Sequence, residues 1–271
     1  MSIEVSKQRE KRVILDFSDE KSFPSEILDV ISKWFEKLSE STTQDIINSE
    51  VEYNSDVSST IEEKVPQDII EELSNSILQI INKSYFLVYH ITKVIDSEEL
   101  RKNGLQTNKI DRYIKHLSNN LRCIGACDED ISIAMEMIKR SYEEKYWGRE
   151  SHLCFFPNYH SIIRKKDTYD IVMQFSQNIG GELARKALSE KLPSVYKLLA
   201  DSGKQVVVKA LLPSENFFYS MENVAKQFLY FYGAKLFWKR EYTIDFDCST
   251  LRDLPPYLII DVFDFPRFLE E

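Results

Sequence analysis

Glycine is scarce in this chain, and the short glycine-rich motifs that bind phosphate groups are missing. Only 7 of the 271 residues are glycine. The sequence contains no G-x-G-x-x-G motif, which argues against a Rossmann-type dinucleotide site. It contains no G-x-x-x-x-G-K-[ST] motif either, which argues against a P-loop. These two classes of nucleotide-binding protein are therefore disfavoured.

Cysteine is also scarce, and its spacing is not typical of a disulfide framework. The four cysteines are Cys123, Cys127, Cys154 and Cys248. The first two lie one helical turn apart, but no second pair of Cys or His residues completes a zinc site. Free thiols are typical of reducing compartments. We therefore expect a cytoplasmic protein without a metal site.

Long apolar runs and an excess of positive charge are both absent. The longest apolar runs, such as 84–91 and 257–262, are far too short to span a bilayer, so no membrane association is expected. The amino terminus is rich in charged side chains, which is not the pattern of a signal peptide. The formal net charge is −9. This charge argues against a general nucleic-acid coat, because such binding needs clustered Lys and Arg.

What the chain does have is enough apolar sequence for a core, with 43% hydrophobic and 12% aromatic residues. Apolar residues recur at helical spacing over 25–38 and again over 66–81, where Pro66 stands at the expected helix start. Residues 39–60 are rich in Ser, Thr, Asn, Asp and Glu and are interpreted as a linker or mobile loop. The sequence thus predicts an amino-terminal helical module with a polar linker over residues 1–83.

From residue 84 onward the pattern mixes strands and helices. Strands are predicted over 84–91, 152–156, 169–175, 206–212, 236–246 and 257–263. Helices are predicted over 97–103, 109–121, 128–146, 180–188 and 221–231. The two kinds of element do not alternate as they do in a doubly wound sheet. We therefore predict an α+β fold with a mixed or antiparallel sheet core, forming one domain over residues 84–271.

Two segments of this second domain stand out together. Residues 88–92 read VYHIT at the end of a hydrophobic strand, and a helix and then Gly104-Leu105 follow. Residues 241–245 read EYTID, and residues 254–259 read LPPYLI. This arrangement resembles the His-Tyr-Glu branch of the ADP-ribosyltransferases, which contains the poly-ADP-ribose polymerases and the diphtheria-type toxins. That family has an early strand with His two residues before Ser or Thr, and a late strand with Glu before a Pro-x-Tyr-Leu-Ile strand.

The resemblance implies an ADP-ribosyltransferase-like fold over roughly residues 84–263 and transfer of ADP-ribose from NAD, used as a substrate. Cleavage of the nicotinamide–ribose bond passes through an oxocarbenium-like transition state, as in glycoside hydrolysis. Glu241 would be the catalytic carboxylate that stabilises this charge. His90 would anchor the ribose and orient NAD, with Thr92 beside it. The candidates for stacking on nicotinamide are Phe155, Phe156 and Tyr159.

The resemblance also implies partners and a role. The acceptor of ADP-ribose would be a macromolecule, either a nucleic acid or a protein. An enzyme of this kind suits an intracellular toxin or an antiviral defence effector. The amino-terminal module would then suit regulation or an inhibitory partner protein.

Two other functions remain open on the sequence. Ile91 follows His90 where the family usually has Gly, and the family's Tyr has no clear counterpart. These departures fit a non-catalytic interaction or regulatory protein with a degenerate transferase-like fold. A third function, a metal-dependent nuclease, would use clustered acids to bind Mg²⁺. Its candidate residues are Asp245, Asp247, Asp261 and Asp264.

Overall fold

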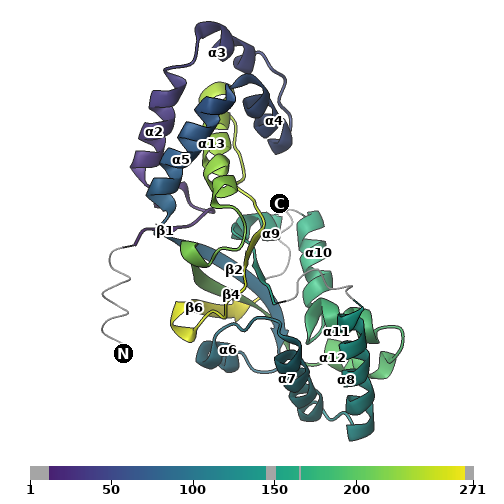
Figure 1. Cartoon of the computed structure of the whole chain (residues 1–271). Coiled ribbons are helices and arrows are strands. Elements are labelled where there is room, and N and C mark those ends of the chain that lie inside the picture. The colour runs from purple at the N-terminus through teal and green to yellow at the C-terminus, as the bar shows by residue number, and fades with distance from the viewer. Residues whose placement is uncertain (1–11, 145–150, 165, 266–271) are drawn as a thin grey trace. The chain divides into compact units, whose positions relative to one another are not determined.

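The computed structural model describes residues 12–144, 151–164 and 166–265 (Figure 1). The chain is a mixed α+β protein, 56% helical and 15% strand, so the α+β class is confirmed, whereas the ADP-ribosyltransferase-like fold stays a prediction. Its contacts divide it into two compact units, each described here by itself. Unit 1 holds the described residues up to Val88, together with Phe156–Asn158 and Leu211–Cys248. Unit 2 holds Tyr89–Phe155, Tyr159–Ala210 and the described residues from Ser249 onward.

The main sheet has four strands in the order β1-β2-β4-β6. Their bounds are Ile14–Leu15 for β1, Tyr85–Val94 for β2, Lys204–Pro213 for β4 and Ile259–Asp264 for β6. The β1–β2 pair is parallel and the β4–β6 pair is antiparallel, so the sheet is mixed. A second sheet pairs β3 (Leu153–Phe155) with β5 (Cys248–Thr250). The strands predicted over 84–91, 152–156 and 206–212 are thus confirmed as β2, β3 and β4.

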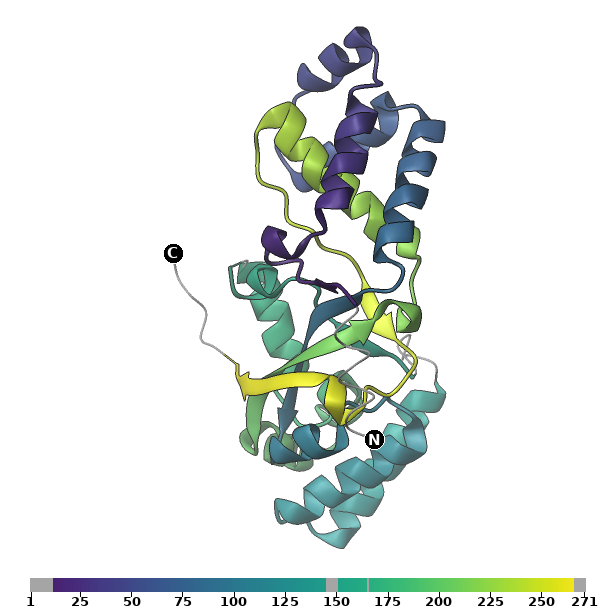
Figure 2. The same cartoon turned by 90° about the vertical axis from the view of Figure 1, so that its left-hand side faces the viewer.

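Unit 1 is built around helix α13 (Met221–Trp238), which packs against α2, α4 and α5 (Figure 2). Its other helices are α2 (Ser25–Phe35), α3 (Glu40–Ile47), α4 (Asn54–Lys64) and α5 (Gln67–Ile81), with 3-10 turns at Glu20–Ser22 and Ser214–Asn216. Aromatic rings fill the core. Phe86 and Phe228 are fully buried, and Phe17 lies edge-on to Phe86 at 5.5 Å between ring centroids. The helices predicted over 25–38 and 66–81 are confirmed as α2 and α5.

The linker predicted over residues 39–60 is wrong, because this segment folds into helix α3 and most of helix α4. Ser39 caps α3 by accepting a hydrogen bond from the backbone N–H of Thr42 at 3.1 Å. Asp56 accepts a bond from the backbone N–H of Tyr53 at 2.7 Å at the start of α4. The two helices have few apolar residues, and all of these except the exposed Ile47 are fully buried: Ile46, Val57 and Ile61. The amino-terminal caps and the burial of a few apolar side chains therefore stabilise two helices that the polar composition of this segment does not predict.

Unit 2 contains a cluster of helices beside its part of the sheet. The helices are α6 (Glu98–Asn103), α7 (Ile110–Cys123), α8 (Asp128–Glu143), α9 (Tyr159–Arg164), α10 (Lys166–Ser176), α11 (Gly181–Leu188) and α12 (Pro193–Asp201). Helix α8 packs against α7 and α11, and α11 packs against α12. Fully buried aliphatic residues at helical spacing form their core, among them Leu121, Ala134, Ile138 and Leu188. The helices predicted over 97–103, 109–121, 128–146 and 180–188 are confirmed, although α8 ends at Glu143 and residues 145–146 lie outside the described residues.

Three predicted strands need correction. The strand predicted over 169–175 is helix α10. The strand predicted over 236–246 does not form, because α13 continues to Trp238 and residues 239–247 have no regular secondary structure. The strand predicted over 257–263 begins as a 3-10 turn at Pro256–Leu258 and becomes β6 only at Ile259.

The boundary predicted between residues 83 and 84 stays a prediction, and the contacts add that residues 211–248 pack with the amino-terminal helices.

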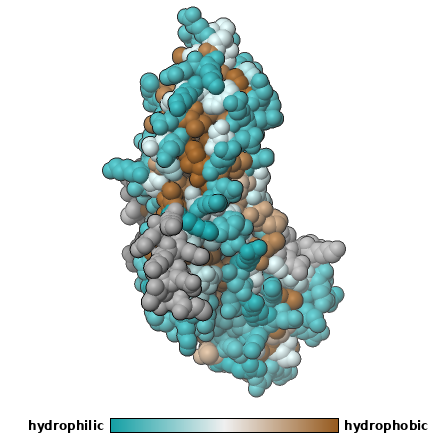
Figure 3. Space-filling model, turned by 60° about the vertical axis from the view of Figure 1, so that its left-hand side comes forward, coloured by the Kyte–Doolittle hydropathy of each residue, from teal (hydrophilic) through white to brown (hydrophobic). Residues whose placement is uncertain are grey.

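All four cysteines are free thiols, as the sequence indicates. None of the described helices combines the length and the apolar character that a membrane span requires. Figure 3 shows one face that is largely hydrophilic, with apolar residues gathered mainly in a band along its upper part. In unit 1 the exposed apolar side chains include two neighbouring rings, Phe218 and Tyr219.

Candidate functional site

His90 lies in strand β2, and the backbone of β3 holds its ring. Its Nδ1 lies 2.8 Å from the carbonyl oxygen of Cys154. Because a carbonyl oxygen only accepts hydrogen bonds, Nδ1 must carry the proton and donate it. The ring of Phe155 packs against the imidazole edge-on, at 5.9 Å between centroids. The structure therefore fixes both the orientation and the tautomer of His90.

The imidazole of His90 is held in its neutral form. Burial lowers its pKa below the ordinary value, and the bond to Cys154 only partly opposes this effect. In the neutral tautomer Nε2 carries a lone pair and accepts a hydrogen bond. Within the described part of the chain Nε2 has no partner, and it is not one of the fully buried polar atoms that lack one. Nε2 is therefore an acceptor that no hydrogen bond between the described residues uses.

The lowered pKa of His90 makes stability depend on pH. The unfolded chain takes up a proton on this residue near the ordinary value of about 6.5, whereas the folded chain resists protonation. Protein stability should therefore fall as pH drops below about 6.5, toward the lower pKa of the folded state. In His90→Asn the amide N–H can still donate to Cys154, but the titrating group is gone. Urea unfolding at pH 7.5 and pH 5.5 should show a smaller acid loss for this variant. Equal losses for both proteins would contradict the prediction.

The other predicted cofactor residues divide between the two faces of β2. Thr92 lies two residues after His90, and alternation along the strand puts it on the same face. Tyr159, at the start of α9, instead packs against Tyr89, with ring centroids 5.0 Å apart. Since Tyr89 precedes His90, alternation puts Tyr159 on the opposite face. The structure thus brings Phe155 and Thr92 to His90, but not Tyr159. Phe156 follows β3, is half-buried and belongs to unit 1.

Glu241 lies in unit 1, in the irregular segment after α13, and not on the predicted strand. Its side chain is exposed, but both neighbours are anchored. The guanidinium of Arg240 donates to the backbone carbonyls of Val51 and Glu52, each at 2.6 Å. The hydroxyl of Tyr242 donates to the side chain of Gln227 at 3.2 Å. Because Glu241 and His90 belong to different units, their pairing stays a prediction.

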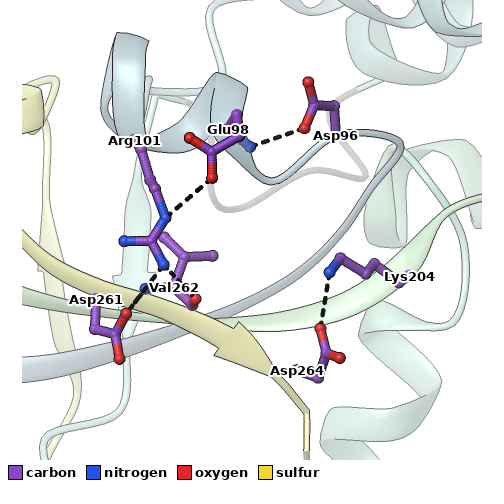
Figure 4. A network of polar contacts seen from close by, with 7 residues as sticks. All are labelled: Asp96, Glu98, Arg101, Lys204, Asp261, Val262 and Asp264. Atoms are coloured by element: carbon purple, nitrogen blue, oxygen red, sulfur yellow. Dashed lines mark hydrogen bonds and ion pairs between the residues drawn. The ribbon is translucent and has the colours of Figure 1, made fainter.

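The Gly104-Leu105 and LPPYLI segments meet within unit 2. Leu105 and Leu254 exchange two backbone hydrogen bonds, at 2.9 and 2.7 Å. The backbones approach so closely that a Cβ on Gly104 would lie 2.1 Å from the Leu254 carbonyl oxygen. Arg101 of α6 donates to the carboxylate of Asp261 at 3.0 Å and to the carbonyl of Val262 at 2.7 Å (Figure 4). These hydrogen bonds connect α6 to β6, and they connect the loop after α6 to the segment before β6.

One polar network at this junction was missed by the sequence reasoning. The carboxylate of Asp253 accepts bonds from the backbone N–H and the hydroxyl of Thr107, both at 2.8 Å. Arg112 of α7 donates to the same carboxylate at 2.6 Å. Partial burial alone would raise the pKa of Asp253, but these hydrogen bonds outweigh it and hold the pKa below its ordinary value. Because Asp253 is more than a hundred residues away from Thr107 and Arg112 in the chain, the local sequence does not predict this contact.

The four aspartates of the nuclease alternative are distributed over both units. Asp261 is paired with Arg101, and Asp264 with Lys204 at 3.0 Å, both in unit 2 (Figure 4). Asp245 and Asp247 belong to unit 1, where they line a pocket. Across the described residues no group of three or more His, Cys, Asp or Glu side chains is arranged to hold a metal ion.

Comparisons with known proteins give no family for this chain. No protein-family model, no curated protein and no solved structure matches it.

Proposed function

We propose that this chain transfers ADP-ribose from NAD to a macromolecular acceptor, at a site that includes His90. The observation that carries the proposal is the fixed, neutral imidazole of His90, whose Nδ1 donates to the Cys154 carbonyl. Its Nε2 is left as an acceptor, which suits the hydroxyl of a ribose as donor. The proposed fold of the domain is accordingly ADP-ribosyltransferase-like.

The side chains near His90 support NAD as the substrate. Phe155 packs edge-on against the imidazole and gives the site an aromatic wall. Thr92 lies on the same face of β2 and offers a hydroxyl as donor or acceptor. The same alternation turns the side chain of Ile91 toward the opposite face, so its bulk does not cover the imidazole.

In the proposed reaction Glu241 is the catalytic carboxylate. The bond between nicotinamide and the ribose breaks, and a new bond forms from the same ribose carbon to a nucleophile of a nucleic acid or a protein. Positive charge develops on the ribose as nicotinamide leaves. A carboxylate beside the ribose stabilises this charge and can accept a hydrogen bond from the 2′-hydroxyl. Glu241 suits this role because its exposed side chain stands between two anchored residues.

The biological role that accompanies this proposal rests on the resemblance to the ADP-ribosyltransferases. We propose a cytoplasmic toxin or antiviral defence effector. The amino-terminal helices would then receive an inhibitory partner protein.

The direct test is incubation of the purified chain with a cell lysate and NAD labelled in its adenylate part. We expect label on a macromolecule and release of nicotinamide. Digestion of the labelled product with nuclease or with protease then identifies the acceptor. NAD alone should raise the melting temperature, because a ligand that binds only the native state stabilises it. No turnover together with no rise in melting temperature would overturn the proposal and favour a non-catalytic interaction protein.

The variant His90→Asn tests the proposed role of Nε2. It can keep the donor to Cys154 but lacks the acceptor for the ribose, so NAD binding should weaken about tenfold, the effect of one lost hydrogen bond. His90→Gln is the matched comparison, since its amide oxygen can reach the position of Nε2. Calorimetric titration with NAD measures both variants. Unchanged binding by His90→Asn would remove His90 from the site.

A further inference from the structure

Strand β6, in unit 2, is an edge strand of the main sheet. It pairs with β4 on one side and is the last strand in the order β1-β2-β4-β6, so no described strand pairs with its other side. We call that other side the outer edge. Strands in this position present unpaired backbone N–H and C=O groups, to which a strand of another chain can add. An outer edge of this kind favours association of protein chains unless other groups block it.

The backbone of Val262 faces the outer edge. Phe265, directly after the strand, donates its backbone N–H to the carbonyl oxygen of Gln205 at 3.0 Å, so its polar groups face β4. In an antiparallel pair the residues alternate between those that bond the partner strand and those that do not. The N–H and C=O groups of Val262 and Asp264 therefore point away from β4.

Two side chains of unit 2 bond both polar groups of Val262 (Figure 4). The carboxylate of Asp261 accepts a hydrogen bond from the N–H of Val262 at 2.8 Å. The guanidinium of Arg101, from α6, donates to the carbonyl oxygen of Val262 at 2.7 Å and to Asp261 at 3.0 Å. The bond from Arg101 is the main reason why the pKa of Asp261 lies below its ordinary value, so Asp261 is ionised at neutral pH.

Without these two side chains, the outer edge would fit a second copy of the same strand. When two identical antiparallel strands are related by a two-fold axis, a residue on the axis exchanges both backbone hydrogen bonds with its own copy. Val262 can take this place, and residues 260–264 of the two copies then lie opposite each other. Ile260 is 45% exposed and offers an apolar side chain to this pairing. The two backbone groups that the pairing needs are those that Asp261 and Arg101 bond.

We propose that Arg101 and Asp261 block the outer edge of β6 against pairing with β6 of a second copy of this chain. Asp261 takes the N–H of Val262, and Arg101 takes the C=O and holds the carboxylate of Asp261 in place. The proposal goes beyond the transfer of ADP-ribose and does not rest on it, because it uses neither His90 nor Glu241.

The double variant Arg101→Ala, Asp261→Ala tests this proposal, because it frees both backbone groups and leaves the net charge unchanged. Analytical ultracentrifugation of the full chain over a series of concentrations measures the mass. The mass of the double variant should rise with concentration to twice that of the wild type. Arg140→Ala, Glu144→Ala is the matched control, since it removes an exposed ion pair of 3.2 Å at the end of α8 in the same unit. This control should keep the wild-type mass.

Adding Asp264→Pro to the double variant separates strand pairing from aggregation of a damaged fold. The N–H of Asp264 faces the outer edge, so its loss removes no hydrogen bond to β4, whereas pairing about Val262 would use it. The triple variant should therefore return to the wild-type mass. Circular dichroism confirms that each variant is folded. If the double variant does not fold, Arg101→Met replaces it with the same expected result, because Met keeps an apolar chain but cannot donate to Val262.

Three results would overturn the proposal. One is a folded variant without Arg101 that keeps the wild-type mass at every concentration. Another is association of that variant that Asp264→Pro does not reduce. The third is a wild type that associates by itself and loses this association with Asp264→Pro, because its outer edge would then not be blocked.

Discussion

Gly104→Ala is expected to lower the free energy of unfolding by about 3 kcal/mol or more. Gly104 has φ +73° and ψ −168°, a backbone region that residues with a Cβ hardly ever adopt. An added Cβ would also lie 2.1 Å from the Leu254 carbonyl oxygen and 2.9 Å from atoms of Pro255 and Pro256. These neighbours are backbone atoms, so relief requires the Leu105–Leu254 hydrogen bonds to break.

The matched control for this change is Gly125→Ala in the same unit. Gly125 also has a positive φ, +87°, but an added Cβ would meet nothing within 4 Å. Its cost should be only that of the left-handed backbone, about 1 kcal/mol. Urea unfolding followed by circular dichroism measures both variants. Equal losses of stability would mean that the approach of Gly104 to Leu254 contributes nothing to the fold.

Helix α5 and strand β2 could be predicted because their signals are local. In α5 the apolar residues follow a helical period, and Pro66 directly precedes the first helical residue. In β2 a run of aromatic and β-branched residues is buried from Tyr85 through Tyr89. Such patterns depend only on neighbours in the chain, so they can be read without knowing the tertiary structure.

Segments whose structure depends on distant contacts were mispredicted. Helices α3 and α4 have few apolar residues, of which Ile46, Val57 and Ile61 are buried by the rest of unit 1. In α10 the β-branched and aromatic residues suggested a strand, but Val172 and Ser176 are buried one helical turn apart. Short apolar runs fit both structures, and tertiary packing decides between them.

The candidate site likewise combines a feature that the local sequence predicts with contacts that it does not. The position of His90 on a strand follows from the sequence, but its hydrogen-bond partner is a backbone carbonyl 64 residues away. Because every residue type has a backbone carbonyl, the sequence does not show which residue is the partner of His90. The hydrogen bond from Thr107 to Asp253 joins residues that are 146 positions apart, so the local sequence around either residue does not predict it. The chemistry of His90 is therefore set by contacts that only the folded chain reveals.

Glu241→Gln is expected to lower kcat for NAD cleavage by about 10²- to 10³-fold, the usual effect of removing one electrostatic contact to a transition state. The amide has the shape of the carboxylate and can still bond the ribose 2′-hydroxyl, so NAD binding should change little. What is lost is the negative charge that faces the developing oxocarbenium ion. Nicotinamide release at saturating NAD measures kcat directly, and the concentration dependence gives KM.

The change at Glu241 can be separated from damage to the fold. Its side chain is exposed, and the anchoring bonds of this segment belong to Arg240 and Tyr242, so Glu241→Gln should melt at the wild-type temperature. Glu50→Gln is the matched control, because Glu50 is also exposed and non-helical in unit 1. This control should turn over NAD at the wild-type rate. If Glu241→Gln raised KM and left kcat intact, Glu241 would bind NAD equally in the ground and transition states, and another group would have to stabilise the charge on the ribose.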